Sequence, residues 1–193
     1  MNIVDWNARY VIGDTPWEKG GPAPPLAEYL DSNEVKGRVL VPGCGLGHDV
    51  RLLARADCTP IGFDLSQCAL NQAQSFPKVG KEKYVLGNYF EPPDNYLEAF
   101  DWIFEHTFFC AFDPSLRQDY VTRTHSLLKT RCYFLAVFFV EIEDPEGPPF
   151  PVSTKEIDQL FGDRFETVKA WVPTRAYEGR ELLEEMRVMR KLS

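Results

Sequence analysis

Apolar and polar positions along the chain follow two alternating patterns. Short, nearly continuous apolar runs are typical of strands that are buried on both faces of a sheet. These runs are Arg38–Val41, Pro60–Phe63, Lys83–Leu86, Phe100–Phe104 and Tyr133–Val140. Segments with the 3.6-residue period of helices lie beside them at Leu26–Asn33, His48–Arg55, Gln67–Ser75, Pro114–Leu128 and Ser153–Phe161. The alternation predicts parallel βαβ units, with helices on both faces of one sheet.

The C-terminal part of the chain departs from this alternation. Arg164–Val172 and Leu182–Met189 are predicted as two final strands, with no long helix between them. We therefore expect an antiparallel addition at the edge of a mostly parallel, seven-stranded sheet of the Rossmann-like α/β class, with an antiparallel C-terminal strand. Two serines mark helix starts: Ser66 as an N-cap, and Ser153 with Glu156 as a capping box.

Residues 1–25 form a distinct opening segment. It is rich in Trp, Gly and Pro, and we expect it to be mostly irregular. No repeat, low-complexity tract or linker divides residues 1–193, so the chain is expected to form a single domain. In open α/β sheets ligands bind beyond the carboxyl ends of the strands, so functional residues are sought after each strand.

Composition and charge exclude several classes of binding partner. The formal net charge of −8 disfavours nucleic acid and anionic membranes, since phosphate binding needs a basic surface. No apolar stretch reaches the ~20 residues of a membrane helix, and the opening residues lack the features of a signal peptide. The five cysteines form no CxxC pair, which indicates a reducing cytoplasm rather than zinc or disulfides. We expect a cytoplasmic monomer that holds no metal and acts on a small molecule.

A nucleotide-binding pattern follows the first strand. Residues 39–49 read as a strand, a glycine turn over Gly43–Gly47 and a helix start. The pattern is G-x-G-x-G, and His48 stands where a dinucleotide site wants a third glycine. This disfavours NAD and favours adenosylmethionine, which has no pyrophosphate. Asp64 follows Gly43 by 21 residues, the spacing of a carboxylate that takes ribose hydroxyls. The alternative is that Asp64 only caps the next helix.

Four further motifs, read in order, identify a family. Residues 14–20 are Asp-Thr-Pro-Trp-Glu-Lys-Gly, and residues 41–45 are Val-Pro-Gly-Cys-Gly. Residues 104–111 are Phe-Glu-His-Thr-Phe-Phe-Cys-Ala, and residues 147–150 are Gly-Pro-Pro-Phe. The chain resembles the thiopurine S-methyltransferase superfamily, and within it the plant-type halide/thiol methyltransferases. The resemblance implies the class I methyltransferase fold, with S-adenosyl-L-methionine as cofactor and S-adenosyl-L-homocysteine as product.

The resemblance also assigns roles by position. In this reading the opening segment is an aromatic lid over the cofactor. Asp64 matches the ribose ligand, Asn88 stands where the family often has Asp, and His106 stands where the plant enzymes have Tyr, next to the methyl group. The full expected cofactor set is Trp6, Tyr10, Trp17, Gly43, Gly45, Asp64, Leu65, Asn88, Tyr89, Glu105 and His106.

Methyl transfer from a sulfonium needs a positioned donor and a dry pocket more than acid–base chemistry. The aromatic walls are expected from Trp6, Trp17, Phe108, Phe109 and Phe139. A halide acceptor needs no base, whereas a thiol gains from one. His106 is accordingly a candidate base or substrate contact, and Phe108 and Trp6 are the other expected catalytic positions. The structural alternatives are that the tryptophans only fasten the opening segment and that His106 only lines the pocket.

Several residues receive a structural interpretation. Glu105 either orients the cofactor or His106, or caps the next turn. His48 and His125 are expected to be structural or exposed, and Cys44 is not expected to be a nucleophile. Residues 141–144 are read as a solvated loop rather than a metal site.

The sequence therefore predicts a methyltransferase that acts on a small soft nucleophile: a thiol, hydrosulfide, a halide or a thiopurine. The alternative is a non-catalytic adenosylmethionine-binding sensor or partner module. A protein or nucleic acid methyltransferase is disfavoured by the acidic balance and by the lack of an Asn-Pro-Pro-Tyr-type motif after the fourth strand. A nicotinamide oxidoreductase is disfavoured by the glycine pattern.

Overall fold

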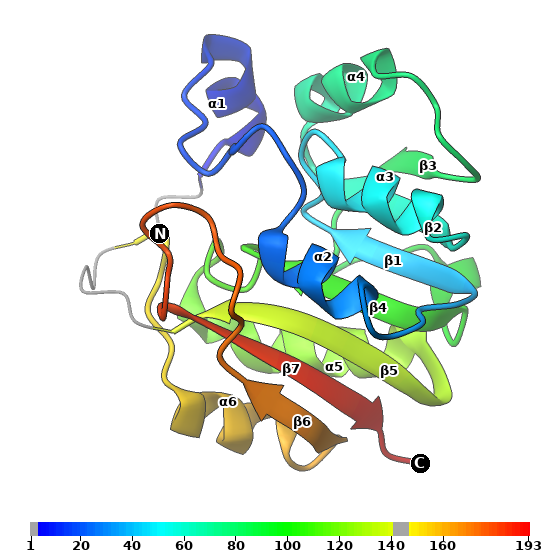
Figure 1. The fold of residues 1–193 in the computed structure, drawn as a ribbon, viewed down its shortest axis with the longest axis vertical. Helices are drawn as coiled ribbons and strands as arrows, with labels where there is room; N and C mark the ends of the chain where they lie inside the picture. Colours follow the sequence, from blue (N-terminus) through cyan, green and yellow to red (C-terminus); the bar gives the residue numbers. More distant parts are fainter. Residues whose placement is uncertain (1–3, 141–146) are drawn as a thin grey trace.

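All seven described strands belong to one central sheet, ordered β3-β2-β1-β4-β5-β7-β6 (Figure 1). The computed structural model describes residues 4–140 and 147–193. The strands are β1 (Arg38–Pro42), β2 (Thr59–Asp64), β3 (Lys83–Leu86), β4 (Phe100–His106), β5 (Leu128–Phe139), β6 (Phe165–Trp171) and β7 (Glu184–Lys191). Strands β1 to β5 pair in parallel, and β7 pairs antiparallel with both β5 and β6. The predicted Rossmann-like sheet with an antiparallel C-terminal strand is confirmed.

Helices cover both faces of the sheet. They are α1 (Trp6–Ile12), α2 (Pro24–Leu30), α3 (His48–Arg55), α4 (Gln67–Ser75), α5 (Arg117–Leu127) and α6 (Thr154–Phe161), with 3₁₀ turns at Asp94–Tyr96 and Pro114–Leu116. Successive residues of β1 point to opposite cores. Leu40 packs in the core that contains residues of α5 and α6, whereas Val39 and Val41 pack in the core under α2 and α3. This explains why β1 is apolar at nearly every position.

Two predicted helix starts are confirmed in detail. The Ser66 hydroxyl accepts the Ala69 N–H at 3.0 Å at the start of α4. The Ser153 hydroxyl accepts the Glu156 N–H at 3.2 Å at the start of α6. The capping box is not reciprocal, however, because the Glu156 carboxylate pairs with Arg117 at 2.6 Å instead.

The structure refines three local predictions. The opening segment is mostly irregular as expected, but α1 forms within it, capped by Asp5, whose carboxylate accepts the Ala8 N–H at 2.9 Å. The predicted helix Pro114–Leu128 begins as a 3₁₀ turn and ends at Leu127. The last two strands are added antiparallel at the sheet edge as expected, with β7 between β5 and the outermost strand β6. The predicted loop 141–144 lies outside the described residues.

The opening segment is placed at the carboxyl end of the sheet by two contacts. The Asn7 side-chain oxygen accepts hydrogen bonds from the Ser66 hydroxyl and the Cys68 N–H, at 3.1 and 3.0 Å. These contacts set α1 beside α4 (Figure 1). Within the two described stretches, no helix has both the length and the apolar character that a membrane span requires.

Candidate active site

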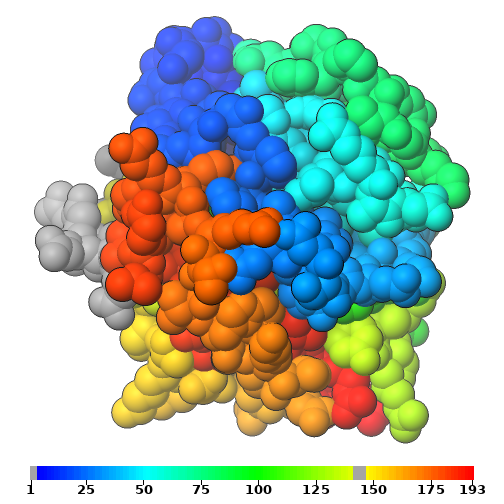
Figure 2. Space-filling model, viewed as in Figure 1, coloured from blue at the N-terminus to red at the C-terminus, as the bar shows by residue number. Residues whose placement is uncertain are grey.

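A cavity of about 320 Å³ lies where the opening segment meets the carboxyl ends of β1, β2 and β4. Its walls come from segments that are distant in the sequence. Residues 172–183, between β6 and β7, lie against the N-terminal part of the chain (Figure 2). The Tyr177 hydroxyl donates to the Gly21 carbonyl at 2.6 Å, and Glu28 accepts the N–H groups of Thr174 and Arg175 at 2.9 and 2.6 Å. The opening segment and the connection between β6 and β7 thus close the cavity together.

The glycine turn after β1 lies flush against two aromatic side chains. Gly43 and Gly45 have φ of +57° and +49°, which side-chain-bearing residues rarely adopt. A Cβ at Gly43 would stand 2.5 Å from the Phe108 ring, and one at Gly45 would stand 2.6 Å from the Tyr10 hydroxyl. Only glycine lets the backbone form this floor of the cavity.

Asp64 closes the same turn from β2. One carboxylate oxygen accepts the Gly45 N–H at 2.8 Å, and the other accepts the Ser66 N–H at 2.8 Å. The side chain lines the cavity but is nearly buried, and this burial raises its pKa above the ordinary value, against the lowering effect of the N–H donors. Each oxygen accepts one N–H and has a second lone pair for a ligand hydroxyl.

The aromatic residues of the opening segment form a connected group. The Trp17 ring meets Trp6 and Tyr10 edge to face, with centroids 5.2 and 5.7 Å apart. The Trp17 indole N–H donates to the Tyr10 hydroxyl at 2.9 Å, and the Arg9 guanidinium lies 4.4 Å from the Trp17 ring centroid. All three rings also line the cavity. The three rings thus pack on one another within the opening segment and face the cavity together.

Most of the predicted site residues meet at this cavity. Asn88 and Tyr89 line it, but the Tyr89 hydroxyl is hydrogen-bonded to Thr124 at 2.8 Å and only its ring is available. Glu105 and Phe109 do not line it. The predicted residues in the lining are Trp6, Tyr10, Trp17, Gly43, Gly45, Asp64, Leu65, Asn88, Tyr89, His106, Phe108 and Phe139.

Glu105 caps the turn that follows β4, which is the second of its two predicted roles. One carboxylate oxygen accepts the N–H groups of Phe108 and Phe109, each at 2.9 Å. The other oxygen is buried without a partner among the described residues. Thr107, between the strand and the turn, is held at φ +58°, a strained conformation for a β-branched residue. Glu105 thus fixes the backbone from which His106 and Phe108 project.

Burial raises the pKa of Glu105 from 4.5 to about 7. The native state therefore holds this proton more tightly than the unfolded chain. The free energy of unfolding is expected to fall as the pH rises from about 4.5 to about 7, by roughly 3 kcal/mol from this group. In Glu105→Gln this fall should disappear. Urea unfolding at pH 5 and pH 8 measures it, with the exposed Glu91→Gln as control. An equal pH dependence in both variants would contradict this assignment.

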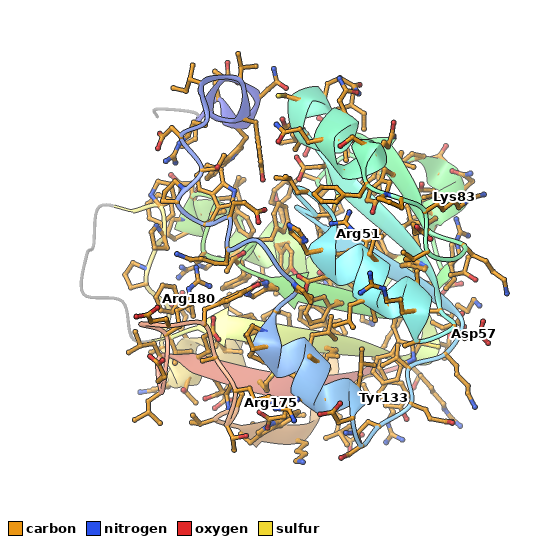
Figure 3. All side chains as sticks on the ribbon, turned by 45° about the horizontal axis from the view of Figure 1, so that its top comes forward. Arg51, Asp57, Lys83, Tyr133, Arg175 and Arg180 are labelled. Atoms are coloured by element: carbon orange, nitrogen blue, oxygen red, sulfur yellow. The ribbon has the colours of Figure 1, made fainter. Side chains whose placement is uncertain are left out.

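His106 stands at the end of β4 in a charged environment. Its Nδ1 lies 3.3 Å from an Asp49 carboxylate oxygen, and its ring stacks on Tyr177 at 5.9 Å between centroids. Its Nε2 is buried without a hydrogen-bond partner and lies 4.0 Å from a Glu184 oxygen. Glu184 in turn pairs with Arg180 at 3.2 Å, and Arg180 belongs to the segment before β7 (Figure 3).

Sequence reasoning missed several residues of the cavity wall. Asp49 follows the glycine turn closely in the sequence, so that motif could have pointed to it. Tyr177 and Arg180 carried no signal, because only the folding back of the C-terminal segment brings them to β4. His48 is structural as expected, but it also lines the cavity. Its Nε2 lies 3.1 Å from Glu18, and this hydrogen bond is the main cause of the lowered Glu18 pKa.

Two findings concern a cysteine nucleophile and metal binding. Desolvation raises the pKa of the Cys44 thiol well above its usual range, and the nearby Asp64 adds to the effect, so the thiol stays protonated. Across residues 4–140 and 147–193, no three His, Cys, Asp or Glu side chains are grouped so as to hold a metal ion.

Comparison with known proteins decides the family. The model of the thiopurine S-methyltransferase (TPMT) family matches residues 1–182. The chain belongs to the thiopurine S-methyltransferase family. Members of this family use S-adenosylmethionine, and this chain shares that cofactor.

Individual relatives agree with the family assignment. The chain is 35% identical over 163 residues to the probable thiol methyltransferase 2 of Arabidopsis thaliana, covering 81% of this chain and 70% of the relative. It is 32% identical over 161 residues to thiocyanate methyltransferase 1 of Brassica oleracea, with the same coverage of 81% and 70%.

A solved structure shares the fold. It is the 1,6-didemethyltoxoflavin-N1-methyltransferase of Burkholderia thailandensis with bound S-adenosylhomocysteine, at a TM-score of 0.74 and 18% identity, covering 98% of this chain and 86% of that one.

The cavity of this family member fits the cofactor. The glycine turn lines the cavity with bare backbone, and the Asp64 oxygens have lone pairs to spare. Aromatic faces at the lid suit a sulfonium cation. The volume of about 320 Å³ lies within the range of small-molecule sites.

Proposed function

We propose that this family member transfers the methyl group of S-adenosylmethionine to a small soft nucleophile, of the class that comprises thiols, hydrosulfide, halides and thiopurines. The observation that carries the proposal is that one cavity joins the glycine turn, Asp64 and the aromatic lid to the acceptor-side residues of β4. The printed names of the relatives, thiol and thiocyanate methyltransferases, support this acceptor class.

We assign the cofactor side of the cavity to β1, β2 and the lid. When bound, the cofactor supplies a methyl group that is already activated for in-line displacement. Asp64 is proposed to accept the ribose hydroxyls, and Asn88 and the Tyr89 ring to lie beside the adenine. The Gly43–Gly45 backbone is proposed to support the amino acid portion. Trp6, Tyr10 and Trp17 would then close over the cofactor and exclude water, which favours a reaction in which charge is dispersed.

The acceptor side is assigned to the end of β4 and the segments that cover it. Phe108 and Phe139 supply apolar walls, and His106 supplies a polar group at the place where the acceptor enters. The alternative, a sensor that only binds the cofactor, would need no open space beyond it. The cavity extends past the glycine turn to Phe139, Pro148 and Pro149, which favours a catalytic site.

The acceptor screen tests this proposal. Purified protein is incubated with S-adenosylmethionine and, separately, with iodide, hydrosulfide, thiocyanate, ethanethiol and a thiopurine, and the methylated products are quantified. Turnover on at least one of them is expected. Cofactor binding without turnover on any acceptor would overturn the proposed acceptor class and support the sensor.

The state of the cysteines bears on the compartment in which the reaction takes place. All five cysteines are free thiols, which fits a reducing compartment such as the cytoplasm.

A further inference from the structure

Two buried polar atoms that lack partners lie at the acceptor end of the cavity, one on the lining residue His106 and one on Glu184 behind it. Among the described residues, neither the His106 Nε2 nor one Glu184 oxygen makes a hydrogen bond. The other Glu184 oxygen lies 4.0 Å from the same Nε2, which is beyond hydrogen-bond distance. Buried polar groups are normally paired, so these two atoms are suited to bind a polar group of a ligand.

The hydrogen-bond partner of Nδ1 determines which of the two ring nitrogens carries the hydrogen in the neutral imidazole. Asp49 can only accept hydrogen bonds while it is ionised, and its second oxygen already accepts the Ala23 N–H at 2.7 Å. At 3.3 Å from Asp49, Nδ1 must therefore bear the ring hydrogen. In the neutral ring Nε2 then has a free lone pair. Both unpartnered atoms are hydrogen-bond acceptors, so a group that satisfies Nε2 must bring a hydrogen.

The charges around His106 also disfavour a bare anion. Asp49 on α3 and Glu184 on β7 flank the ring, while Arg180 contributes one positive charge through its pairing with Glu184. Glu105 lies next to His106 on β4, and Tyr177 covers the ring face. Two flanking carboxylates against one guanidinium leave an excess negative charge, which repels an anion such as iodide or thiocyanate.

Resting on the methyl transfer proposed above, we infer that His106 is the catalytic base for an acceptor that arrives as a neutral thiol, with Asp49 and Glu184 as positioning residues. The S–H bond breaks and its proton forms an N–H bond at Nε2, while the sulfur lone pair forms the new S–CH₃ bond. The electron pair of the breaking S⁺–CH₃ bond stays on the cofactor sulfur. The new N–H lies beside Glu184, and the proton returns to water after the thioether leaves. Hydrogen bonds of catalytic bases are commonly completed only when the substrate is bound.

Asp49→Asn is the sharpest test. The amide oxygen can still accept the Ala23 N–H, but the amide NH₂ facing Nδ1 donates to it and moves the ring hydrogen to Nε2. This is the wrong tautomer for a base. We expect kcat/KM for ethanethiol to fall at least about tenfold more than kcat/KM for iodide, since general bases contribute about 10²-fold or more. Wild-type protein should also prefer ethanethiol to iodide. His106→Gln should reproduce the loss, whereas the distant controls Asp94→Asn and His125→Gln should not.

A second readout is independent of turnover. The chain has three histidines, so the ¹⁵N resonances of labelled imidazoles can be assigned with the His106→Gln variant. The wild-type His106 should show the Nδ1–H tautomer, and Asp49→Asn should show Nε2–H. A wild type with the Nε2–H tautomer, a preference for iodide, or an equal loss on both acceptors in Asp49→Asn would overturn the inference. Failure of the proposed function would give a different result. No acceptor would then be methylated, whereas the tautomer of His106 could still be measured.

Discussion

Asp64→Asn is expected to raise the dissociation constant for S-adenosylhomocysteine by about 30-fold or more. The proposed ribose hydroxyls would lose a charged acceptor, and hydrogen bonds to charged groups are stronger than those to neutral groups by about 1–2 kcal/mol each. Calorimetric titration of the wild-type and variant proteins measures the change. Asp94→Asn, at an exposed position in a 3₁₀ turn, is the matched control and should leave the dissociation constant unchanged.

The same variant should also lose some stability, because the carboxylate holds the glycine turn. The Gly45 and Ser66 N–H groups are accepted by different oxygens of Asp64. In an amide one of these two positions is an NH₂ donor, so one of the two hydrogen bonds is lost. We expect a loss of roughly 1–3 kcal/mol in the free energy of unfolding. A folded variant with wild-type affinity would contradict the placement of the ribose.

Gly43→Ala is expected to destabilise the protein by roughly 2–4 kcal/mol and to abolish cofactor binding. The added methyl requires a left-handed backbone in a non-glycine residue, and it overlaps the Phe108 ring at 2.5 Å. Phe108 is itself confined by Tyr89, Phe112 and Tyr120, at 5.4 to 5.9 Å between ring centroids. Relief of the overlap must therefore come from the turn, which forms the floor of the cavity.

Gly13→Ala separates the cost of the left-handed backbone from the cost of the overlap with Phe108. Gly13 has φ +73° but nothing within 4 Å of an added Cβ, so it should cost only the backbone strain, about 1 kcal/mol. Thermal unfolding and S-adenosylhomocysteine titration of both variants make the comparison. If Gly43→Ala were no more destabilised than Gly13→Ala and still bound the cofactor product, the close fit between turn and Phe108 would be refuted.

Much of the fold follows from local signals in the sequence. The bounds of α3, α4 and β3 coincide with the predicted segments, because glycine turns, a serine cap and apolar runs fix them locally. Helix α1 was missed because its defining contacts are an Asp5 cap and the Asn7 contacts to the α4 region. The position of β7 inside the sheet depends on long-range pairing, which no local pattern encodes.

The same distinction holds for the site. The glycine turn, Asp64 and the aromatic lid were identified from motifs and family resemblance, and they do line one cavity. The environment of His106 was not predictable, since Asp49, Tyr177 and Glu184 come from three separate segments. The role of Glu105 was left between two alternatives because sequence does not show where a carboxylate points. The structure shows it bonded to the backbone of the following turn.

Calorimetric titration of the wild-type protein with S-adenosylhomocysteine tests the central claim most directly. If the cavity between the lid and the carboxyl ends of β1, β2 and β4 is the cofactor site, saturable binding at one site per chain is expected. Absence of binding by a folded protein would contradict the assignment of the glycine turn, Asp64 and the lid to the cofactor, and with it the proposed methyl transfer.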